Sequence, residues 1–225
     1  MSIIEIIKKT IRDHKSLWPQ RYFYLNAGLG FLFLLFSFFV NYAANVFVSN
    51  RASNYVSDLI LDNLPVINVN FIFVEGFAMF IALAIIFLLK EPQKIPFAVK
   101  TIAVFILIRS AFIILTHLAV PPNHSFIDPG RFIQNISSGN DLFFSSHTGF
   151  PYLLALLFWK KKYLRTFFIL CSMFFGFVVL LGHLHYSIDV FAAFFITYSI
   201  FCLAQKLFSR DYHLFLNHGV ADKEA

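Results

Sequence analysis

The sequence predicts an all-helical integral membrane protein with six transmembrane helices. Of the 225 residues, 59% are hydrophobic and only 13% are charged, and the mean hydropathy is +0.72. In soluble globular domains about a quarter of the residues are charged. With 32 Phe but only 18 basic and 12 acidic residues, the chain lacks the polar residues that a water-soluble surface requires. The composition therefore excludes a soluble domain, a disordered chain and a fibrous protein.

Six apolar segments account for most of the chain. A helix needs about 20 apolar residues to cross the hydrocarbon core of a bilayer. The candidate spans are residues 22–48, 70–89, 97–120, 145–159, 164–181 and 186–208. The fourth is short, so we expect its outer end to begin below the membrane surface. No linker separates a second domain, and residues 1–225 are predicted to form a single integral membrane domain.

The distribution of basic residues predicts the topology. Fifteen Lys and Arg residues flank one set of span ends, whereas the other connections hold only Arg51 and Arg131. Because positive charge accumulates on the cytoplasmic side, both termini are expected to be cytoplasmic. The basic pI near 9.3 thus reflects membrane topology, and nucleic acid is not an expected partner. A bacterial cytoplasmic membrane is the expected location, with the Golgi or plasma membrane as the eukaryotic equivalent.

The first residues allow two interpretations. Ile3, Ile4, Ile7 and Ile11 lie opposite Lys8, Lys9 and Arg12, which is typical of an amphipathic helix lying on the inner leaflet. A frayed basic tail is equally compatible with the same residues. The two cysteines, Cys171 and Cys202, lie inside apolar runs and indicate neither a disulfide framework nor a cysteine zinc site.

Ionisable residues at the start of the sixth span indicate a catalytic site. Asp189 follows His185 by four residues, so the two side chains share a helix face. The carboxylate can fix the tautomer of the imidazole and stabilise the imidazolium, as a nucleophilic histidine requires.

A second polar cluster opens the fourth span. Ser145 is a plausible N-cap, and a helix N-terminus with free N–H groups suits a phosphate or another anion. His147 lies beside it, and the topology brings His147 and His185 to the same side of the membrane. Two histidines facing an anion site can perform in-line phosphoryl transfer: His185 attacks phosphorus and His147 protonates the leaving oxygen.

These motifs resemble those of a known family. Ser-Ser-His-Thr at 145–148 and His-Tyr-Ser-Ile-Asp at 185–189 look like the two histidine motifs of the type-2 phosphatidic acid phosphatase superfamily, in the branch that contains sphingomyelin synthases. Residues 109–122 are similar to the third-span motif of that branch. The resemblance covers about residues 57–208. It implies a catalytic triad of His147, His185 and Asp189 that needs no cofactor and no metal.

The resemblance also implies an activity. Sphingomyelin synthases move a phospho-headgroup between lipids, and the expected function is a similar transfer through a phosphohistidine intermediate. The substrates would be a membrane phospholipid or lipid phosphate and a lipid hydroxyl acceptor. A lipid phosphate phosphatase that uses water with the same triad is the alternative. The sequence does not indicate an oligomeric state.

The sequence departs from the family patterns at the phosphate site. Ser146 replaces the usual glycine, and Val179 stands where the phosphatase branch carries an arginine. The upstream Lys and Arg motif of that branch is also missing, which favours the synthase-like branch. The remaining candidates for substrate or phosphate binding are Asp141, Ser145, Ser146, Arg109 and His183, with Arg131 as a further cation.

Several alternatives stay open at this stage. Arg109, near the middle of the third span, could pair with Glu75 instead of touching substrate. His183 could combine with His147, His185 and Asp189 into a zinc-like set. The chain could also be a transporter or channel subunit in which intramembrane ionisable residues form an ion path, or a catalytically inactive scaffold.

Overall fold

The computed structural model describes residues 3–49, 51, 54–116, 118–128 and 142–217. Within these ranges the chain forms helices joined by loops and contains no strand. The helices are α1 (Ile3–Leu17), α2 (Arg21–Ser49), α3 (Phe77–Leu89), α4 (Ile95–Thr116), α6 (Ser146–Leu157), α7 (Lys162–Leu181), α8 (Ser187–Leu207) and α9 (Ser209–Asn217). A π-helical turn, Ile72–Gly76, leads directly into α3. The predicted all-helical class is confirmed.

The number of full spans needs correction. Five helical segments are long and apolar enough to cross a membrane: Arg21–Ser49, Ile72–Leu89, Pro92–Thr116, Lys162–Leu181 and Ser187–Leu207. The fourth predicted span is α6, a helix of 12 residues. At 1.5 Å per residue it is about 18 Å long, which is too short for a hydrocarbon core of about 30 Å. The described part therefore has five candidate spans and the shorter helix α6, so a sixth full span is not confirmed.

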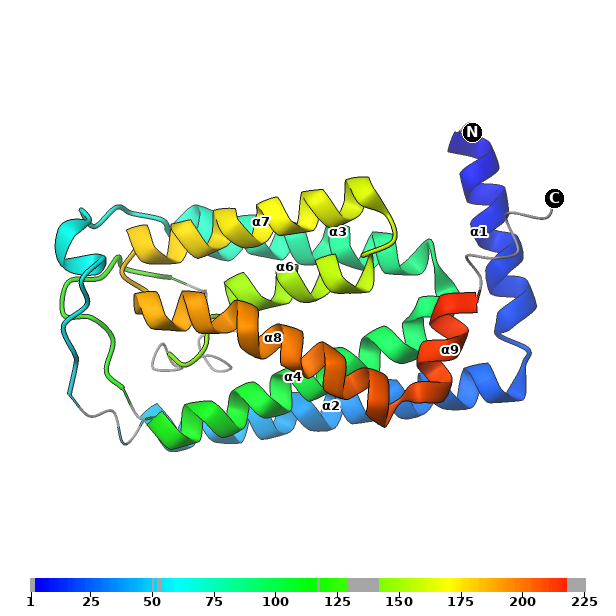
Figure 1. The fold of residues 1–225 in the computed structure, drawn as a ribbon, viewed down its shortest axis with the longest axis horizontal. Helices are drawn as coiled ribbons and strands as arrows, with labels where there is room; N and C mark the ends of the chain where they lie inside the picture. Colours follow the sequence, from blue (N-terminus) through cyan, green and yellow to red (C-terminus); the bar gives the residue numbers. More distant parts are fainter. Residues whose placement is uncertain (1–2, 50, 52–53, 117, 129–141, 218–225) are drawn as a thin grey trace.

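The short helix α6 lies within the bundle, where it contacts both α7 and α8 (Figure 1). Most of its residues are buried, and its N-terminal residue Ser146 faces the end of the bundle that carries the loops before α3 and α8. As expected, α6 begins below that end. The polar first turn of this helix is consequently placed inside the protein.

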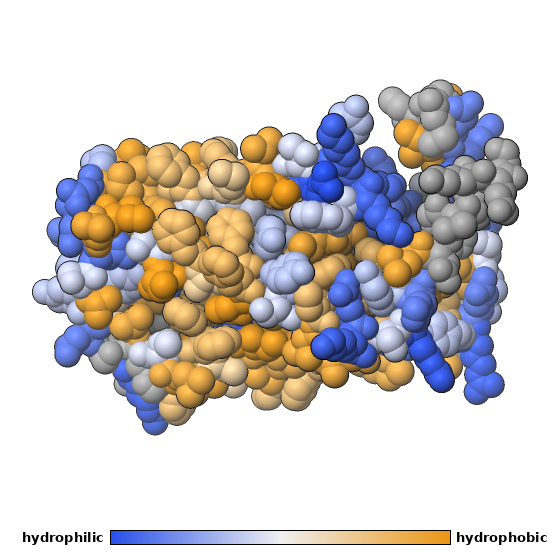
Figure 2. Space-filling view, in the orientation of Figure 1, coloured by the Kyte–Doolittle hydropathy of each residue, from blue (hydrophilic) through white to orange (hydrophobic). Residues whose placement is uncertain are grey.

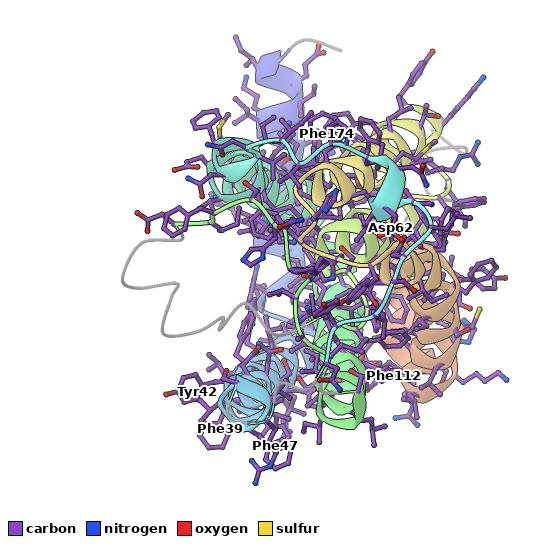
Figure 3. The ribbon with its side chains drawn as sticks, turned by 90° about the vertical axis from the view of Figure 1, so that its left-hand side faces the viewer. Phe39, Tyr42, Phe47, Asp62, Phe112 and Phe174 are labelled. Atoms are coloured by element: carbon purple, nitrogen blue, oxygen red, sulfur yellow. The ribbon has the colours of Figure 1, made fainter. Side chains whose placement is uncertain are left out.

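The outer surface of the bundle is apolar. Phe39, Tyr42 and Phe47 of α2 point away from the other helices in the view from the loop end (Figure 3), and the exposed fraction of Phe39 is 68%. Figure 2 shows apolar side chains over the middle of the molecule and polar ones gathered towards both ends. Since burying apolar side chains against lipid tails is favourable, this surface is the one that faces the hydrocarbon core.

Both described ends of the chain lie at the same end of the bundle, where α1 and α9 cross the ends of the long helices (Figure 1). A buried ion pair fastens α9 there: Lys100 Nζ lies 2.6 Å from Asp211 Oδ2. Lys100 also donates to Asn26 Oδ1 at 2.9 Å, and the Tyr22 hydroxyl donates to Asp211 Oδ1 at 3.0 Å. Side chains of α2, α4 and α9 thus form one polar cluster.

Close packing around α6 depends on a glycine. A Cβ added to Gly149 would meet Thr197 Oγ1 at 2.8 Å and the Phe105 ring at 3.0 Å. Overpacking of this kind typically costs about 1–3 kcal/mol. We therefore expect Gly149→Ala to lower the melting temperature of the detergent-solubilised protein. The control is Gly28→Ala, because nothing lies within 4 Å of a Cβ at Gly28. Equal melting temperatures for both variants would contradict this packing.

Candidate active site

The first turn of α8 is held by two carboxylates. The backbone N–H of Tyr186, the N-cap residue, donates to Asp189 Oδ2 at 3.0 Å. The next N–H, on Ser187, donates to Asp58 Oδ2 at 2.6 Å. Acidic groups at a helix N-terminus are favoured because they accept from free N–H groups and face the positive end of the helix dipole. The two contacts fix the position of His185, which immediately precedes Tyr186.

Asp58 is a residue that the sequence interpretation overlooked. Asp58 Oδ1 accepts from Ile60 N at 2.9 Å and Leu61 N at 3.2 Å. The only helical structure there is a 3₁₀ turn, Leu61–Asn63. Burial raises the pKa of Asp58, but the backbone donors of Ser187, Leu61 and Ile60 outweigh burial and hold that pKa below its ordinary value.

His185 is buried and has two neighbours at Nδ1. The Leu142 carbonyl oxygen lies 2.8 Å away and Asp189 Oδ2 lies 3.4 Å away. A carbonyl oxygen can only accept, so Nδ1 must carry the proton, which assigns the tautomer. Nε2 then keeps its lone pair. A neutral imidazole with a free Nε2 lone pair beside a carboxylate is suited to nucleophilic attack.

Asp189 is fully buried and has an unused acceptor. Its Oδ2 faces His185 and the Tyr186 N–H, whereas Oδ1 has no hydrogen-bond partner within the part of the chain that the structure describes. Buried polar atoms are normally paired, so an exception calls for an explanation. The unpaired Oδ1 would be explained if the carboxylate must stabilise a positive group that forms only during a reaction, such as an imidazolium.

His147 lies in the first turn of α6, directly after the Ser145 N-cap and Ser146. The Ser145 N–H donates to the Asp189 carbonyl oxygen at 3.2 Å, which ties the start of α6 to the first turn of α8. His185 and Arg109 are electrostatic neighbours of the His147 ring. The fold therefore brings together the residues that the sequence motifs selected.

Two phenylalanines enclose the ring of His147. The ring centroid lies 4.0 Å from that of Phe73 and 4.1 Å from that of Phe77. Its Nδ1 is buried and has no hydrogen-bond partner among the described residues. Phe73 lies within the π-helical turn before α3, and Phe77 follows that turn. π-Turns are rare and frequently occur at functional sites. Nothing in the local sequence signalled this enclosure.

Arg109 braces the loop that precedes α6. Its guanidinium is buried, and Nε donates to the Phe144 carbonyl oxygen at 3.0 Å. Glu75 is exposed, and among the residues that the structure describes no ion pair joins it to Arg109. The alternative of a structural pair between these two residues is thus not observed. Arg109 instead places its charge close to His147.

The other predicted binding residues have different surroundings. Ser145 is fully buried, and its hydroxyl accepts from Thr148 Oγ1 at 3.3 Å. Ser146, the first residue of α6, is partly buried. Asp141 and Arg131 lie outside the described residues.

His183 lies at a separate cavity. It adopts a left-handed backbone conformation with a φ of 52°, and its Nε2 is 3.2 Å from the Leu64 carbonyl oxygen. His183 lines a cavity of about 330 Å³ together with Asp58 and Tyr186. Among the described residues, no group of three or more His, Cys, Asp or Glu side chains is placed to hold a metal ion. His183 therefore does not form a zinc-like set with His147 and His185.

These features define a class of protein: a polytopic membrane protein with two histidines, a carboxylate and a helix N-terminus brought together inside the bundle. Residues 138–206 match the family model described as PAP2 superfamily C-terminal. This match supports membership of the type-2 phosphatidic acid phosphatase superfamily. The matched segment includes both histidine motifs. Comparisons with curated proteins and with solved structures gave no match. Membership of this superfamily indicates a lipid phosphatase or phosphotransferase.

Proposed function

We propose that the protein is a lipid phosphotransferase that moves a phospho-headgroup between lipids through a phosphohistidine at His185. The observation that carries this proposal is the environment of His185. Its Nδ1 proton is held by the Leu142 carbonyl 2.8 Å away and faces the Asp189 carboxylate, which leaves Nε2 as the nucleophile. His147, on the neighbouring helix terminus, is the general acid and base.

The proposed reaction has two balanced steps. In the first, the Nε2 lone pair of His185 forms a P–N bond while the P–O bond to the leaving group breaks, and His147 gives its proton to the leaving oxygen. In the second, an acceptor hydroxyl gives its proton to His147 while its oxygen bonds phosphorus and the P–N bond breaks. Asp189 stabilises the positive charge on the His185 ring between the two steps.

Charged and dipolar groups near the start of α6 would stabilise the phosphoryl group. The N-terminus of α6 offers free N–H groups and a partial positive charge to an anion. Arg109 adds a full positive charge close to His147. We propose that Ser146 and Arg109 contact the phosphate directly, and that Ser145, Asp141 and His183 contribute to binding of the same substrate.

Two observations favour a lipid acceptor over water. Phe73 and Phe77 enclose His147 at ring distances of 4.0 and 4.1 Å, so the general base is surrounded by apolar groups. Val179, at the position of an arginine in the phosphatase branch, is fully buried in an apolar cluster with Leu142 and Tyr186. Both features support the sphingomyelin synthase-like branch. Hydrolysis by the same residues is the second candidate.

We further propose that residues 1–225 act as one domain in the membrane, with the site facing the extracytoplasmic side. Fifteen basic residues flank the helix ends at the opposite side, and the positive-inside rule makes that side cytoplasmic. A bacterial cytoplasmic membrane would then present the site to the periplasm, within reach of lipids of the outer leaflet.

The test measures which product receives the labelled phosphorus. Purified protein in detergent is incubated with phospholipid or lipid phosphate labelled in the headgroup, with and without diacylglycerol or ceramide. We expect label to move to the added acceptor, and only when the acceptor is present. Free phosphate or a free phospho-headgroup with no labelled acceptor would instead establish a hydrolase. No product from any substrate would overturn the proposal of a lipid phosphotransferase.

A further inference from the structure

Helix α1 carries an apolar stripe that no other described part of the chain covers. Ile4, Ile7 and Ile11 have exposed fractions of 65%, 53% and 50%. Residues three and four apart share one face of a helix, so these three side chains form a continuous stripe. Trp18, 40% exposed, follows seven residues later, just past the helix end.

The C-terminal end of α1 is attached to the bundle through His14, which lies three residues after Ile11 and so on the side of the stripe. Leu17 is buried, and His14 Nε2 lies 2.8 Å from the Leu89 carbonyl oxygen at the end of α3. Trp18 Nε1 donates to His14 Nδ1 at 2.9 Å, so Nε2 of that ring carries the proton and donates to Leu89. Residues 3–17 are therefore an ordered helix docked at one end, and the alternative of a frayed tail does not apply to them.

The direction of α1 suits a membrane surface. Its axis crosses the end of the bundle at a steep angle to the spanning helices, and its N-terminal half extends past the edge of the bundle (Figure 1). A helix that lies along the surface of the bilayer has this orientation, because the spanning helices run roughly along the membrane normal. The part of α1 beyond the bundle edge would rest on lipid.

The charges beside the stripe complement anionic lipids. Lys8, Arg12 and Lys15 are all exposed. Anionic headgroups of a cytoplasmic leaflet attract such residues, and each one near the surface strengthens binding by about fivefold. An apolar stripe with basic residues beside it is the pattern of helices that insert shallowly at this interface.

We infer that α1 is an interfacial anchor for anionic lipid. The side chains of Ile4, Ile7 and Ile11 insert into the leaflet on the side of the termini, and Lys8, Arg12 and Lys15 bind the negatively charged headgroups above them. The site is independent of the catalytic proposal, because none of these residues lies near His147 or His185 in the fold.

The test measures the depth of the stripe with spin labels. The full chain, with Cys171→Ser and Cys202→Ser, is labelled at Ile7→Cys or, as a matched control on the polar side of α1, at Ser16→Cys. Each is reconstituted into vesicles of phosphatidylcholine alone or with phosphatidylglycerol. We expect the label at position 7 to be at least threefold more accessible to oxygen than to a water-soluble nickel chelate in anionic vesicles. The label at position 16 should show the reverse.

The charge contribution is tested in the same samples. Replacing Lys8, Arg12 and Lys15 with Gln should abolish the difference between anionic and neutral vesicles at position 7. If the ratio of oxygen to nickel accessibility were the same at positions 7 and 16, the inference would be overturned, because both sides of α1 would then be in water. A label at position 7 that is equally protected from the nickel chelate in detergent micelles, and whose spectrum is broadened by contact with a second label, would also overturn the inference. In that case a second copy of the chain would cover the stripe.

Discussion

Replacing His185 with glutamine is expected to lower kcat for phosphorus transfer by about 10⁴-fold or more, the scale seen when a catalytic nucleophile is removed. Glutamine is similar in length and polar, and by rotation about its side-chain bonds its amide N–H can donate to the Leu142 carbonyl in place of Nδ1–H. What it lacks is the imidazole Nε2 lone pair that we propose as the nucleophile. The melting temperature should therefore change little while turnover falls to background.

His124→Gln is the matched control for this experiment. The His124 ring bonds the Pro121 carbonyl three residues away in its own loop, at 2.9 Å from Nδ1. The same chemical change there should leave kcat within about twofold of the wild type, since exposed substitutions away from a site have small effects. If His185→Gln kept more than a tenth of the wild-type kcat, His185 would not be the nucleophile.

Asp189→Asn is expected to lower kcat by about 10²–10⁴-fold, as loss of the carboxylate behind a catalytic histidine does elsewhere. The reason is electrostatic. The carboxylate faces His185 Nδ1 at 3.4 Å, and no negative charge would remain there to stabilise the imidazolium. Asparagine retains an oxygen that can accept from the Tyr186 N–H, so most of the helix cap survives.

Asp58→Asn provides a closely matched comparison. Asp58 and Asp189 both accept from the N-terminal N–H groups around α8, at 2.6 and 3.0 Å. Both substitutions should therefore cost similar stability, about 0.5–2 kcal/mol for a damaged cap. Only Asp189 faces His185, so only Asp189→Asn should lose turnover. Equal losses of kcat in the two variants, at equal changes in melting temperature, would assign Asp189 a purely structural role.

The sequence was sufficient to predict the helices of the bundle because their length and apolarity are set by the bilayer. The predicted segment 164–181 and the observed α7, Lys162–Leu181, differ by two residues at one end only. The helix α4 ends at Thr116, earlier than the predicted residue 120. Tertiary contacts explain this difference, since the Ala119 carbonyl accepts from the Tyr186 hydroxyl at 2.9 Å instead of continuing a helix.

Elements that depend on distant contacts were not predictable. The helix α9, nine residues long, is held by the ion pair between Lys100 and Asp211, 111 residues apart in the chain. The shortness of α6 was visible in the sequence, and a sixth full span is not confirmed because this helix has 12 residues and begins inside the bundle.

In the candidate site, too, local contacts were predictable from the sequence and distant contacts were not. The spacing of four between His185 and Asp189 is local, and the sequence predicted that pair. The Leu142 carbonyl at His185, the Phe73 ring on His147 and the Asp58 carboxylate at Ser187 come from segments 43, 74 and 129 residues away. Nothing in a single sequence indicates such partners. Their presence changes the chemistry, because they set the tautomer of one histidine and the polarity around the other.

The most direct test of the central claim is to trap the covalent intermediate. The protein is mixed with ³²P-labelled phospholipid for a short time without acceptor, quenched in alkali, where a phosphohistidine survives, and digested for mass spectrometry. We predict phosphorus on His185, lost in acid, chased off by diacylglycerol or ceramide, and missing from His185→Gln. Phosphorus on another residue, or turnover with no labelled protein at any time point, would contradict a phosphohistidine at His185.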